Sequence, residues 1–450
     1  MNVLSVAVVG SGPAGVYVAD ELTRQLSRPV EVDVYDRLPT PYGLVRYGVA
    51  PDHPQIKSVI LALRRVLEHP SVRFIGNVEI GRDVSMEELR EQYEAVVLAT
   101  GAPHNQDLGV PGEHMAGVFT AADLVSWYSG HPDARALDVS LAGAKSVTVV
   151  GAGNVALDVA RLLAKPHDAL EATDMPDHVI ATLAASDVRE VHVVCRRGPE
   201  HAKFTTKELR ELSKLDDVEV SLRQGEVTTP AGDLDPKTNA NLAVLTELEA
   251  RQVPGAAREI VFHFWRRPVE MVGTASLTGV VVESTEPAGG ADETDVVREL
   301  IASDAVVSAI GFRRTPIDGV PFDAESASVR HDEGRVLDAG GSPVESLYVA
   351  GWLKRGPSGV IGTNRADAAE TVRSMVHDLA DRAGRDGARD RSDLLHSQRG
   401  LDVVDYARWQ LIDDAEMGHA SPRAADRIKL AEWDQLLAAS KVAPTKEEGA

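Results

Sequence analysis

Cysteine is almost absent from this sequence. Among 450 residues, only Cys195 is a cysteine. An internal disulfide, a Cys-x-x-Cys redox pair and an iron–sulfur cluster held by the chain each need more than one thiol, so all three are excluded. A chain with a single thiol is also typical of a reducing compartment, and we therefore expect a cytoplasmic location.

Long apolar runs and an excess of positive charge are missing as well. The chain has no run of 18 apolar residues, and its apolar start lacks a basic segment and leads straight into glycines, so we expect neither a membrane span nor a signal peptide. The formal net charge of −22 repels phosphate, which argues against a nucleic-acid or anionic-membrane partner. The length and the 43% hydrophobic content fit a globular protein of about two to three domains.

The first 36 residues carry a dinucleotide-binding pattern. An apolar strand, Val6–Val9, leads into Gly10-Ser11-Gly12-Pro13-Ala14-Gly15, and a helix and a second strand ending at Asp36 follow. In this pattern the first glycine permits the turn, the second lets backbone amides approach a pyrophosphate, and the third lets helix and strand pack closely. The pattern predicts that Gly10, Gly12, Ala14 and Gly15 contact a dinucleotide and that Asp36 accepts hydroxyls of its ribose. A purely structural turn beside a buried strand is the alternative.

A second unit of the same kind starts at residue 146. The strand Ser146–Val150 leads into Gly151-Ala152-Gly153-Asn154-Val155-Ala156, where alanine replaces the third glycine. Its second strand ends at Arg196 and Arg197 rather than at a carboxylate. A carboxylate would repel a 2′-phosphate, whereas guanidinium groups bind one, so this unit is predicted to bind a phosphorylated dinucleotide and the first unit an unphosphorylated one. The alternative for both arginines is a solvated strand end.

Two crossings indicate the domain organisation. The segment Ala102–Gly109 follows a buried strand that ends at Gly101, and Ala305–Gly311 is itself a buried strand that ends at glycine. Both patterns are typical of a chain that crosses between domains. We therefore expect an α/β protein with two Rossmann-like domains, the first discontinuous and the second inserted in it. The expected ranges are 1–105 for the first part, 106–312 for the inserted domain, and 313–450 for the second part with C-terminal helices.

Several other segments carry weaker expectations. We expect one amphipathic helix over 55–67, a β-rich excursion within 217–300, an exposed connector over 381–393, and a disordered tail from 446. A shaped loop is expected over 39–54, because proline supplies no donor and restricts its predecessor. The glycine-rich turn Gly351–Asn364 puts backbone amides before a helix, which suits a phosphate or a polar ring edge.

These segments together resemble one family. The loop Pro39–Pro54, the runs Gly153–Arg161, Arg196–Pro199 and Phe204–Glu211, and the turn Gly351–Asn364 resemble the adrenodoxin-reductase-like ferredoxin–NADP⁺ reductases, a group that includes bacterial forms. The resemblance covers nearly the whole chain in one order. It implies an FAD flavoprotein that takes a hydride from NADPH and passes single electrons to a transient, acidic, ferredoxin-type iron–sulfur protein. Hydride transfer between stacked rings needs no metal, and none is expected.

The resemblance also implies residue roles. His53 would orient the nicotinamide amide or help proton balance, Trp352 would cover the flavin, and Glu208 would accept a hydroxyl of the NADP ribose. Leu44, Val78, Trp352, Gly359, Val360 and Ile361 would contact FAD, and Gly359 would also contact NADP beside Gly151, Gly153, Asn154 and Val155. Without the resemblance, a loop histidine and a tryptophan after a strand are more often structural.

Three other functions stay open at this point. A flavin monooxygenase would consume NADPH with oxygen and an organic substrate, and a diaphorase or quinone reductase would use a different acceptor. A flavin-binding scaffold would not turn over at all. A disulfide reductase of similar fold is nearly excluded by the single cysteine.

Overall fold

The chain divides into two compact units. The computed structural model describes residues 3–222, 234–286, 297–325, 327–380, 382, 384, 387–419 and 423–442. Unit 1 comprises Met1–His104, Phe312–Ser421 and Leu430–Ala450, and unit 2 comprises Asn105–Gly311 and Pro422–Lys429. The segment Pro422–Lys429 therefore groups with unit 2, whereas the sequence predicts that all residues from 313 to 450 belong to the first domain. The tail from 446 lies outside the described residues.

Unit 1 is built on a seven-stranded sheet of order β16-β17-β18-β4-β1-β2-β3. The strands β1 (Leu4–Val9), β2 (Val30–Tyr35), β3 (Val72–Ile75), β4 (Ala95–Leu98) and β18 (Pro343–Val349) are parallel, and β16 (His331–Asp332) and β17 (Arg335–Leu337) join antiparallel at one edge. All six residues of β1 are buried, as expected of a central parallel strand. Val6 and Val8 belong to one core and Ala7 and Val9 to another, because alternate side chains face opposite sides of the sheet.

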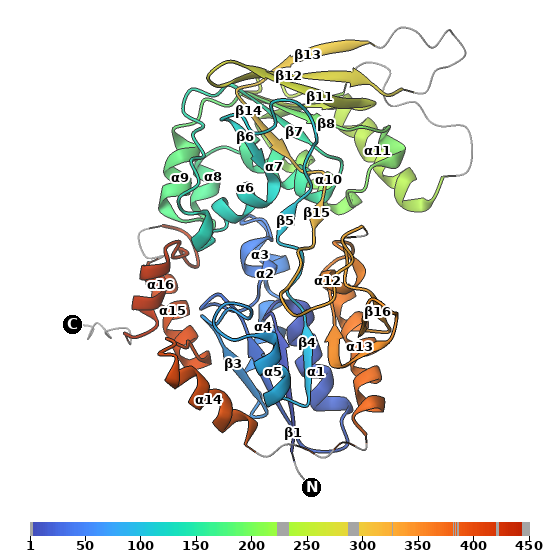
Figure 1. Ribbon diagram of the computed structural model, residues 1–450. Coiled ribbons are helices and arrows are strands. Elements are labelled where there is room, and N and C mark those ends of the chain that lie inside the picture. The colour runs from blue at the N-terminus through green and yellow to red at the C-terminus, as the bar shows by residue number, and fades with distance from the viewer. Residues whose placement is uncertain are drawn as a thin grey trace, which may run out of the picture. The chain divides into compact units, whose positions relative to one another are not determined.

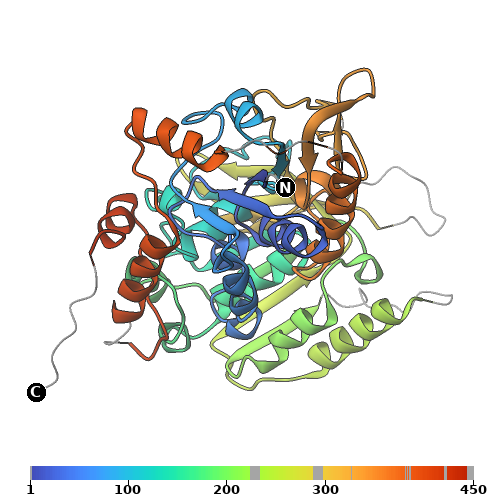
Figure 2. The same ribbon diagram turned by 90° about the horizontal axis from the view of Figure 1, so that it is seen from below.

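Helices cover both faces of this sheet. On one face α1 (Pro13–Gln25) packs against α13 (Thr363–Asp378), the dark blue and orange helices that lie side by side in Figures 1 and 2. The other face carries α5 (Met86–Gln92) and α14 (Ala388–Gln398). The remaining helices of unit 1 are α2 (Leu44–Tyr47), α3 (Pro54–Lys57), α4 (Ile60–Leu67), α12 (Trp352–Arg355), α15 (Tyr406–His419) and α16 (Trp433–Ala439).

Unit 2 repeats the arrangement with a six-stranded parallel sheet of order β6-β14-β7-β8-β10-β9. Its strands are β6 (Val118–Thr120), β7 (Ser146–Val150), β8 (Glu190–Val194), β9 (Val218–Leu222), β10 (Arg258–His263) and β14 (Ala305–Ser308). Its helices are α6 (Ala121–Tyr128), α7 (Asn154–Ala164), α8 (Asp168–Glu171), α9 (Asp177–Ala184), α10 (Thr206–Glu211) and α11 (Pro236–Ala250). The predicted fold class, α/β with two Rossmann-like parallel-sheet units, is confirmed.

Only the later part of the β-rich excursion expected within 217–300 is a separate sheet of unit 2, because residues 236–250 form the helix α11 and β9 and β10 belong to the main sheet. Strands β11 (Arg266–Gly273), β12 (Leu277–Ser284) and β13 (Arg298–Ala302) form an antiparallel sheet that follows β10 (Figure 1). Short 3₁₀ turns occur at Pro132–Ala134, Pro199–His201 and Leu212–Lys214, and β5 (His104–Asn105) pairs with β15 (Phe312–Arg313) where the chain crosses between the units. Within the described residues, no helix combines the length and the apolar character needed to cross a membrane.

Two other local predictions were wrong. The single helix expected over 55–67 is divided into α3 and α4, because the amides of Val59, Leu61 and Ala62 bond to carbonyls three residues back and tighten the chain there. The connector expected over 381–393 ends earlier, since α14 begins at Ala388. Ala388 is buried in the core on the α5 face of the sheet, so tertiary packing supports a helix that the charged local sequence did not indicate.

Candidate cofactor and coenzyme sites

The glycine turn after β1 combines crowded and open positions. A Cβ atom added to Gly10, whose φ is 110°, would lie 2.5 Å from the Ala99 carbonyl oxygen, and one added to Gly15 would lie 1.9 Å from the Gly10 oxygen. Both positions therefore need glycine for the fold. A Cβ added to Gly12 would meet only the Gly43 Cα, at an ordinary 3.9 Å. At Gly12 the protein backbone is therefore open to close approach by a ligand.

The N-terminus of α1 fits an anion. The helix begins at Pro13, its N-cap Gly12 contributes no side-chain hydrogen bond, and its first turn holds no acidic residue. The amides of that turn and the helix dipole therefore favour a negatively charged group in front of them. This is the position predicted for a pyrophosphate.

Asp36 follows β2 and is held in place beside the glycine turn. Its Oδ2 accepts hydrogen bonds from the Ser11 amide at 2.9 Å and the Ser11 hydroxyl at 2.5 Å, and its Oδ1 accepts one from the Leu38 amide at 3.0 Å. A carboxylate has about four acceptor sites, so capacity for ribose hydroxyls is left after these three bonds. Ser11 was not singled out in the sequence, although its position between two glycines was visible there.

Two further glycines bring other loops to the same turn. A Cβ added to Gly43, whose φ is 47°, would lie 3.0 Å from the Gly12 Cα, and one added to Gly351, whose φ is 72°, would lie 2.5 Å from the Ala14 Cβ. The starts of α2 and α12 therefore pack against the start of α1. The structure thus brings the loop of Leu44 and the loop of Trp352 together with the first glycine turn.

The predicted apolar contacts of a flavin differ in exposure. Leu44 is 44% and Val360 is 63% exposed, so neither side chain is buried by the described protein around it. Ile361 packs partly on the core, whereas Val78 is fully buried and approaches Asp36 only through its amide, which bonds to the Asp36 carbonyl at 3.0 Å. Exposed apolar side chains beside open backbone fit a site that an aromatic ring covers.

Trp352 and the glycine-rich turn are anchored by groups that the local sequence did not reveal. The Trp352 ring is half-buried and lies 5.5 Å, centroid to centroid, from the Phe312 ring. The Asp367 carboxylate on α13 accepts the Gly351 amide at 2.5 Å and lies 3.3 Å from the buried Lys354 ammonium. Asp367 was missed because its link to Gly351 spans 16 residues. It holds the turn at its strand end.

Unit 2 reproduces the glycine arrangement. A Cβ added to Gly151 would lie 2.5 Å from the Ala309 carbonyl oxygen, whereas one added to Gly153 would meet nothing within 4 Å. Gly153 is the N-cap of α7 and contributes no side-chain hydrogen bond, and no acidic residue lies in the first turn. The Asn154 side chain accepts the Thr205 amide at 2.7 Å and so ties the start of α10 to this turn. The site again suits an anion in front of a helix.

Arg196 and Arg197 follow β8, and both side chains are exposed. Among the residues that the structure describes, neither guanidinium forms an ion pair with a carboxylate. Two adjacent cations at the end of the second strand of a dinucleotide unit match the position and the charge needed for a 2′-phosphate.

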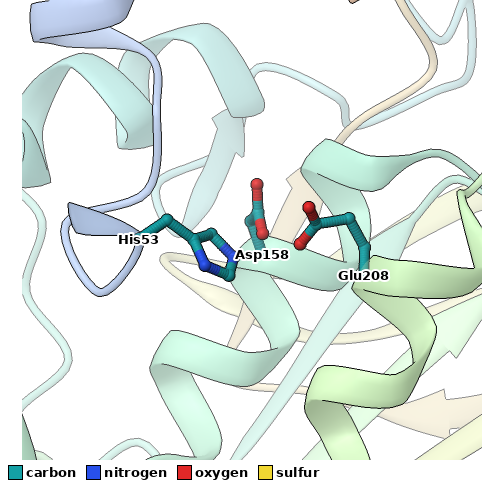
Figure 3. A group of neighbouring side chains, drawn as sticks. All are labelled: His53, Asp158 and Glu208. Atoms are coloured by element: carbon teal, nitrogen blue, oxygen red, sulfur yellow. The ribbon is translucent and has the colours of Figure 1, made fainter. Parts of the chain in front are cut away.

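Glu208 lies on α10 beside α7. It is buried, and its Oε2 is 3.7 Å from Nη1 of the buried Arg161, which also lies 2.7 Å from Oδ1 of Asp158. Figure 3 shows the side chains of Glu208 and Asp158. One guanidinium is thus shared by two carboxylates. Sequence reasoning selected Glu208 and missed Asp158 and Arg161, whose helical spacing of three residues was visible but whose partner was not.

His53 is the N-cap residue of α3 in unit 1 (Figure 3). Its amide donates to the Ala50 carbonyl at 3.0 Å, and its own carbonyl accepts from Ile56 at 3.1 Å. The ring is half-buried. The backbone of this loop is therefore fixed on both sides of the histidine.

Comparisons with known proteins give consistent matches. The family model described as pyridine nucleotide-disulphide oxidoreductase matches residues 4–253. The mitochondrial NADPH:adrenodoxin oxidoreductase of Arabidopsis thaliana is 38% identical over 462 residues, which cover 97% of this chain and 95% of that protein. NADPH-ferredoxin reductase FprA of Mycobacterium tuberculosis is 38% identical over 454 residues, covering 96% and 98%. The structure of Mycobacterium tuberculosis FprA in complex with NADPH matches with a TM-score of 0.90 at 38% identity, covering 98% of this chain and 100% of that one.

Proposed function

The chain belongs to the family of NADPH:adrenodoxin and NADPH-ferredoxin reductases, among the pyridine nucleotide-disulphide oxidoreductases, and we propose which of its residues carry out the reaction of that family. It is an FAD-dependent oxidoreductase that takes a hydride from NADPH and delivers single electrons to a ferredoxin-type iron–sulfur protein. Bound FAD supplies the chemistry that connects a two-electron donor with a one-electron acceptor.

One observation carries the assignment of the two sites. The two units share the glycine turn with an open second glycine, but the second strand is followed by Asp36 in unit 1 and by Arg196 and Arg197 in unit 2. The carboxylate suits the free ribose of FAD, and the guanidinium pair suits the 2′-phosphate of NADPH. Unit 1 is thus the proposed FAD unit and unit 2 the proposed NADP unit.

The proposed FAD contacts are backbone and apolar groups of unit 1 together with Asp36: Gly10, Gly12, Ala14, Gly15, Asp36, Leu44, Val78, Trp352, Gly359, Val360 and Ile361. The proposed NADP contacts are Gly151, Gly153, Asn154, Val155, Arg196, Arg197, Glu208 and Gly359. The uncapped helix starts, the convergence of three glycine turns and the exposure of Leu44 and Val360 support these two sets.

Three side chains have proposed roles in the reaction itself. Trp352, steadied by the Phe312 ring, covers the flavin and keeps water from it. His53, on a loop whose backbone is fixed, orients the nicotinamide amide. Glu208, held beside Arg161, accepts a hydroxyl of the NADP ribose.

The proposed partner is acidic and binds transiently. Because the chain itself carries a formal charge of −22, such a partner must meet a local basic patch. The single cysteine, Cys195, is buried and reduced, which supports the proposed cytoplasmic location.

The function is tested by electron delivery. Purified enzyme with bound FAD should reduce cytochrome c with NADPH far faster when a ferredoxin from the same cell is added. If such ferredoxins never accelerate the reaction while a quinone does, the enzyme is a diaphorase. Consumption of oxygen coupled to an organic substrate would make it a monooxygenase, and the absence of any NADPH oxidation would make it a scaffold.

The coenzyme site is tested by replacing both arginines with alanine. Two charge-assisted contacts, reduced by their exposure to solvent, predict a preference for NADPH over NADH of roughly a hundredfold in kcat/KM. The Arg196→Ala, Arg197→Ala variant should lose most of this preference through a higher KM for NADPH, with NADH nearly unchanged. Lys145→Ala is the control. This exposed residue precedes β7, whereas the two arginines follow the parallel strand β8, so they lie at opposite ends of the strands. Equal losses for both coenzymes would contradict the assignment.

A further inference from the structure

The turn that carries the two arginines is held by the chain that follows β10. The Cys195 amide donates to the His263 carbonyl at 2.8 Å, and the Cys195 carbonyl accepts from the Arg266 amide at 3.0 Å. Between His263 and Arg266, the Trp265 amide donates to the Arg197 carbonyl at 3.4 Å. The link between β10 and β11 is therefore hydrogen-bonded to the backbone of the turn that contains Arg196 and Arg197.

A second attachment comes from the end of β12. The Thr285 hydroxyl donates to the Arg196 carbonyl at 2.5 Å, and the Thr285 amide donates to the Trp265 carbonyl at 2.9 Å. Thr285 thus connects one of the arginines directly with Trp265. The backbone carbonyls of Arg196 and Arg197 both accept from this region.

Trp265 has an unusual backbone and a close side-chain contact. Its φ of 55° lies in the left-handed region, which bulky residues rarely adopt. A Cβ added to Gly198 would lie 2.4 Å from the Cζ2 atom of the Trp265 ring, so the ring occupies the space where a side chain at 198 would lie. The ring also meets the His201 ring edge to face, with centroids 6.2 Å apart. Strained residues persist where the surrounding structure requires them, often near functional sites.

These contacts hold the backbone of Arg196 and Arg197, whose long side chains are exposed. An exposed arginine side chain loses rotamer freedom when it binds a phosphate. Its guanidinium can form two parallel hydrogen bonds to the phosphate only if the arginine Cα is suitably placed. The Trp265 ring is rigid and half-buried, and it packs against the residue that follows Arg197. It can therefore fix where both arginine side chains start.

We propose that Trp265 is a positioning residue for the 2′-phosphate of NADPH: with Thr285 it holds the Arg196–Gly198 turn and so sets the preference for NADPH over NADH. The proposal rests on the proposed NADP site of unit 2. Trp265 does not touch the reacting atoms, and its removal should therefore change coenzyme choice rather than turnover.

The test replaces Trp265 in two ways. Trp265→Gly removes the ring and suits a positive φ, so the backbone is not strained by the change. It should raise the KM for NADPH about tenfold, leave kcat and the NADH kinetics nearly unchanged, and lower the affinity for adenosine 2′,5′-bisphosphate by the same factor. Trp265→Phe keeps an aromatic ring and should restore most of the preference. Glu333→Gly is the matched control, because it places glycine at another left-handed position, with φ of 46°, in unit 1.

Thr285 supplies an independent pair of variants. Thr285→Val removes the hydroxyl that bonds to the Arg196 carbonyl, and Thr285→Ser keeps it. The valine variant should lower the NADPH preference about threefold, and the serine variant should resemble the wild type. Retention of bound flavin and the thermal unfolding temperature show whether each variant is folded.

The outcomes separate this inference from the coenzyme site itself. If the double arginine variant loses the NADPH preference but Trp265→Gly keeps it, Trp265 does not position the turn and the inference is wrong. Equal losses with NADPH and NADH in Trp265→Gly would show a general structural role and would also overturn it. If the wild type has no preference, or the arginine variant keeps it, the proposed NADP site is wrong.

Discussion

Single glycines distinguish what the fold needs from what a ligand needs. In both glycine turns the first glycine is crowded by a neighbouring carbonyl, whereas the second is free of such crowding among the described residues. A glycine that no neighbouring atom requires, repeated at the same place in two units, is explained by the close approach of a pyrophosphate.

This difference gives a prediction for unit 2. Gly153→Ala should leave the unfolding temperature nearly unchanged, because its Cβ meets no atom within 4 Å, but it should weaken NADP⁺ binding tenfold or more. Gly151→Ala should destabilise the protein, because its Cβ would lie 2.5 Å from the Ala309 oxygen. Differential scanning calorimetry and NADP⁺ titration report the two effects separately. Unchanged NADP⁺ affinity in a folded Gly153→Ala variant would argue against a ligand at this turn.

At the scale of elements, the C-terminal helix α15 holds the loop that begins α2. The guanidinium of Arg46 and the carboxylate of Glu416, both buried, form two hydrogen bonds, one of them 2.9 Å long. Arg46 also lies over the rings of Tyr47 and Trp409, at 5.0 and 5.1 Å from their centroids. Burial lowers the pKa of Arg46, but Glu416 outweighs this effect and raises it above the ordinary value. The charged pair therefore fixes α2, which carries Leu44.

Breaking this pair should be costly. Glu416→Ala removes the carboxylate partner of a buried guanidinium and should lower the free energy of unfolding by about 3–5 kcal/mol, with easier loss of FAD from the same loop. Urea unfolding and flavin release measure both effects. The exposed pair Arg64 and Glu68, joined at 2.7 Å at the C-terminal end of α4, is the control, and Arg64→Ala should cost about 0–1 kcal/mol. Similar costs for the buried and the exposed pair would contradict this account.

The replacement of both partners separates charge from packing. Arg46→Met combined with Glu416→Leu fills a similar volume without a buried charge and should recover much of the lost stability. If flavin retention also recovers, apolar packing alone suffices to hold α2. If it does not, the geometry of the ion pair is what the FAD site uses.

At the scale of the whole molecule, one buried and three half-buried histidines contribute to the response to acid. The pKa values of His167, His192, His331 and His396 are all lowered, in each case chiefly by burial. The unfolded chain protonates these rings near pH 6.5, so below that pH the unfolded state binds more protons than the native state. Stability is therefore present above about pH 6.5 and is lost as the pH falls towards the lowered native pKa values.

We expect the unfolding temperature to fall between pH 7.5 and pH 5, before carboxylates with lowered pKa values, such as Asp378 and Asp402, begin to titrate. His192 packs against the His263 ring, with Glu190 and Glu259 nearby, and His192→Gln should flatten this part of the curve. His114→Gln is the control, because its side chain is 89% exposed. An unfolding temperature that rises on acidification over this range would contradict the prediction.

Features whose physical requirements are local could be predicted from the amino-acid sequence. A strand, a crowded glycine, an open glycine and a helix start follow one another within a few residues, so both dinucleotide turns could be recognised. Asp36 and the pair Arg196 and Arg197 stand just after the second strand of each unit, and their charges predicted two different coenzymes. The family resemblance also rested on loops rich in proline and glycine, such as Pro39–Pro54 and Gly351–Asn364.

The distant groups that hold these turns in place became apparent only from the folded chain. Arg423 bonds to the Thr173 and Met175 carbonyls at 2.9 and 2.8 Å, in unit 2, although in the chain it lies between the unit 1 helices α15 and α16. The partners Asp367 for Gly351, Glu416 for Arg46 and Trp265 for Gly198 are likewise far apart in the chain. Such contacts follow from the packing of whole elements, because no helical or strand period relates residues so far apart, and they leave no pattern in a single sequence.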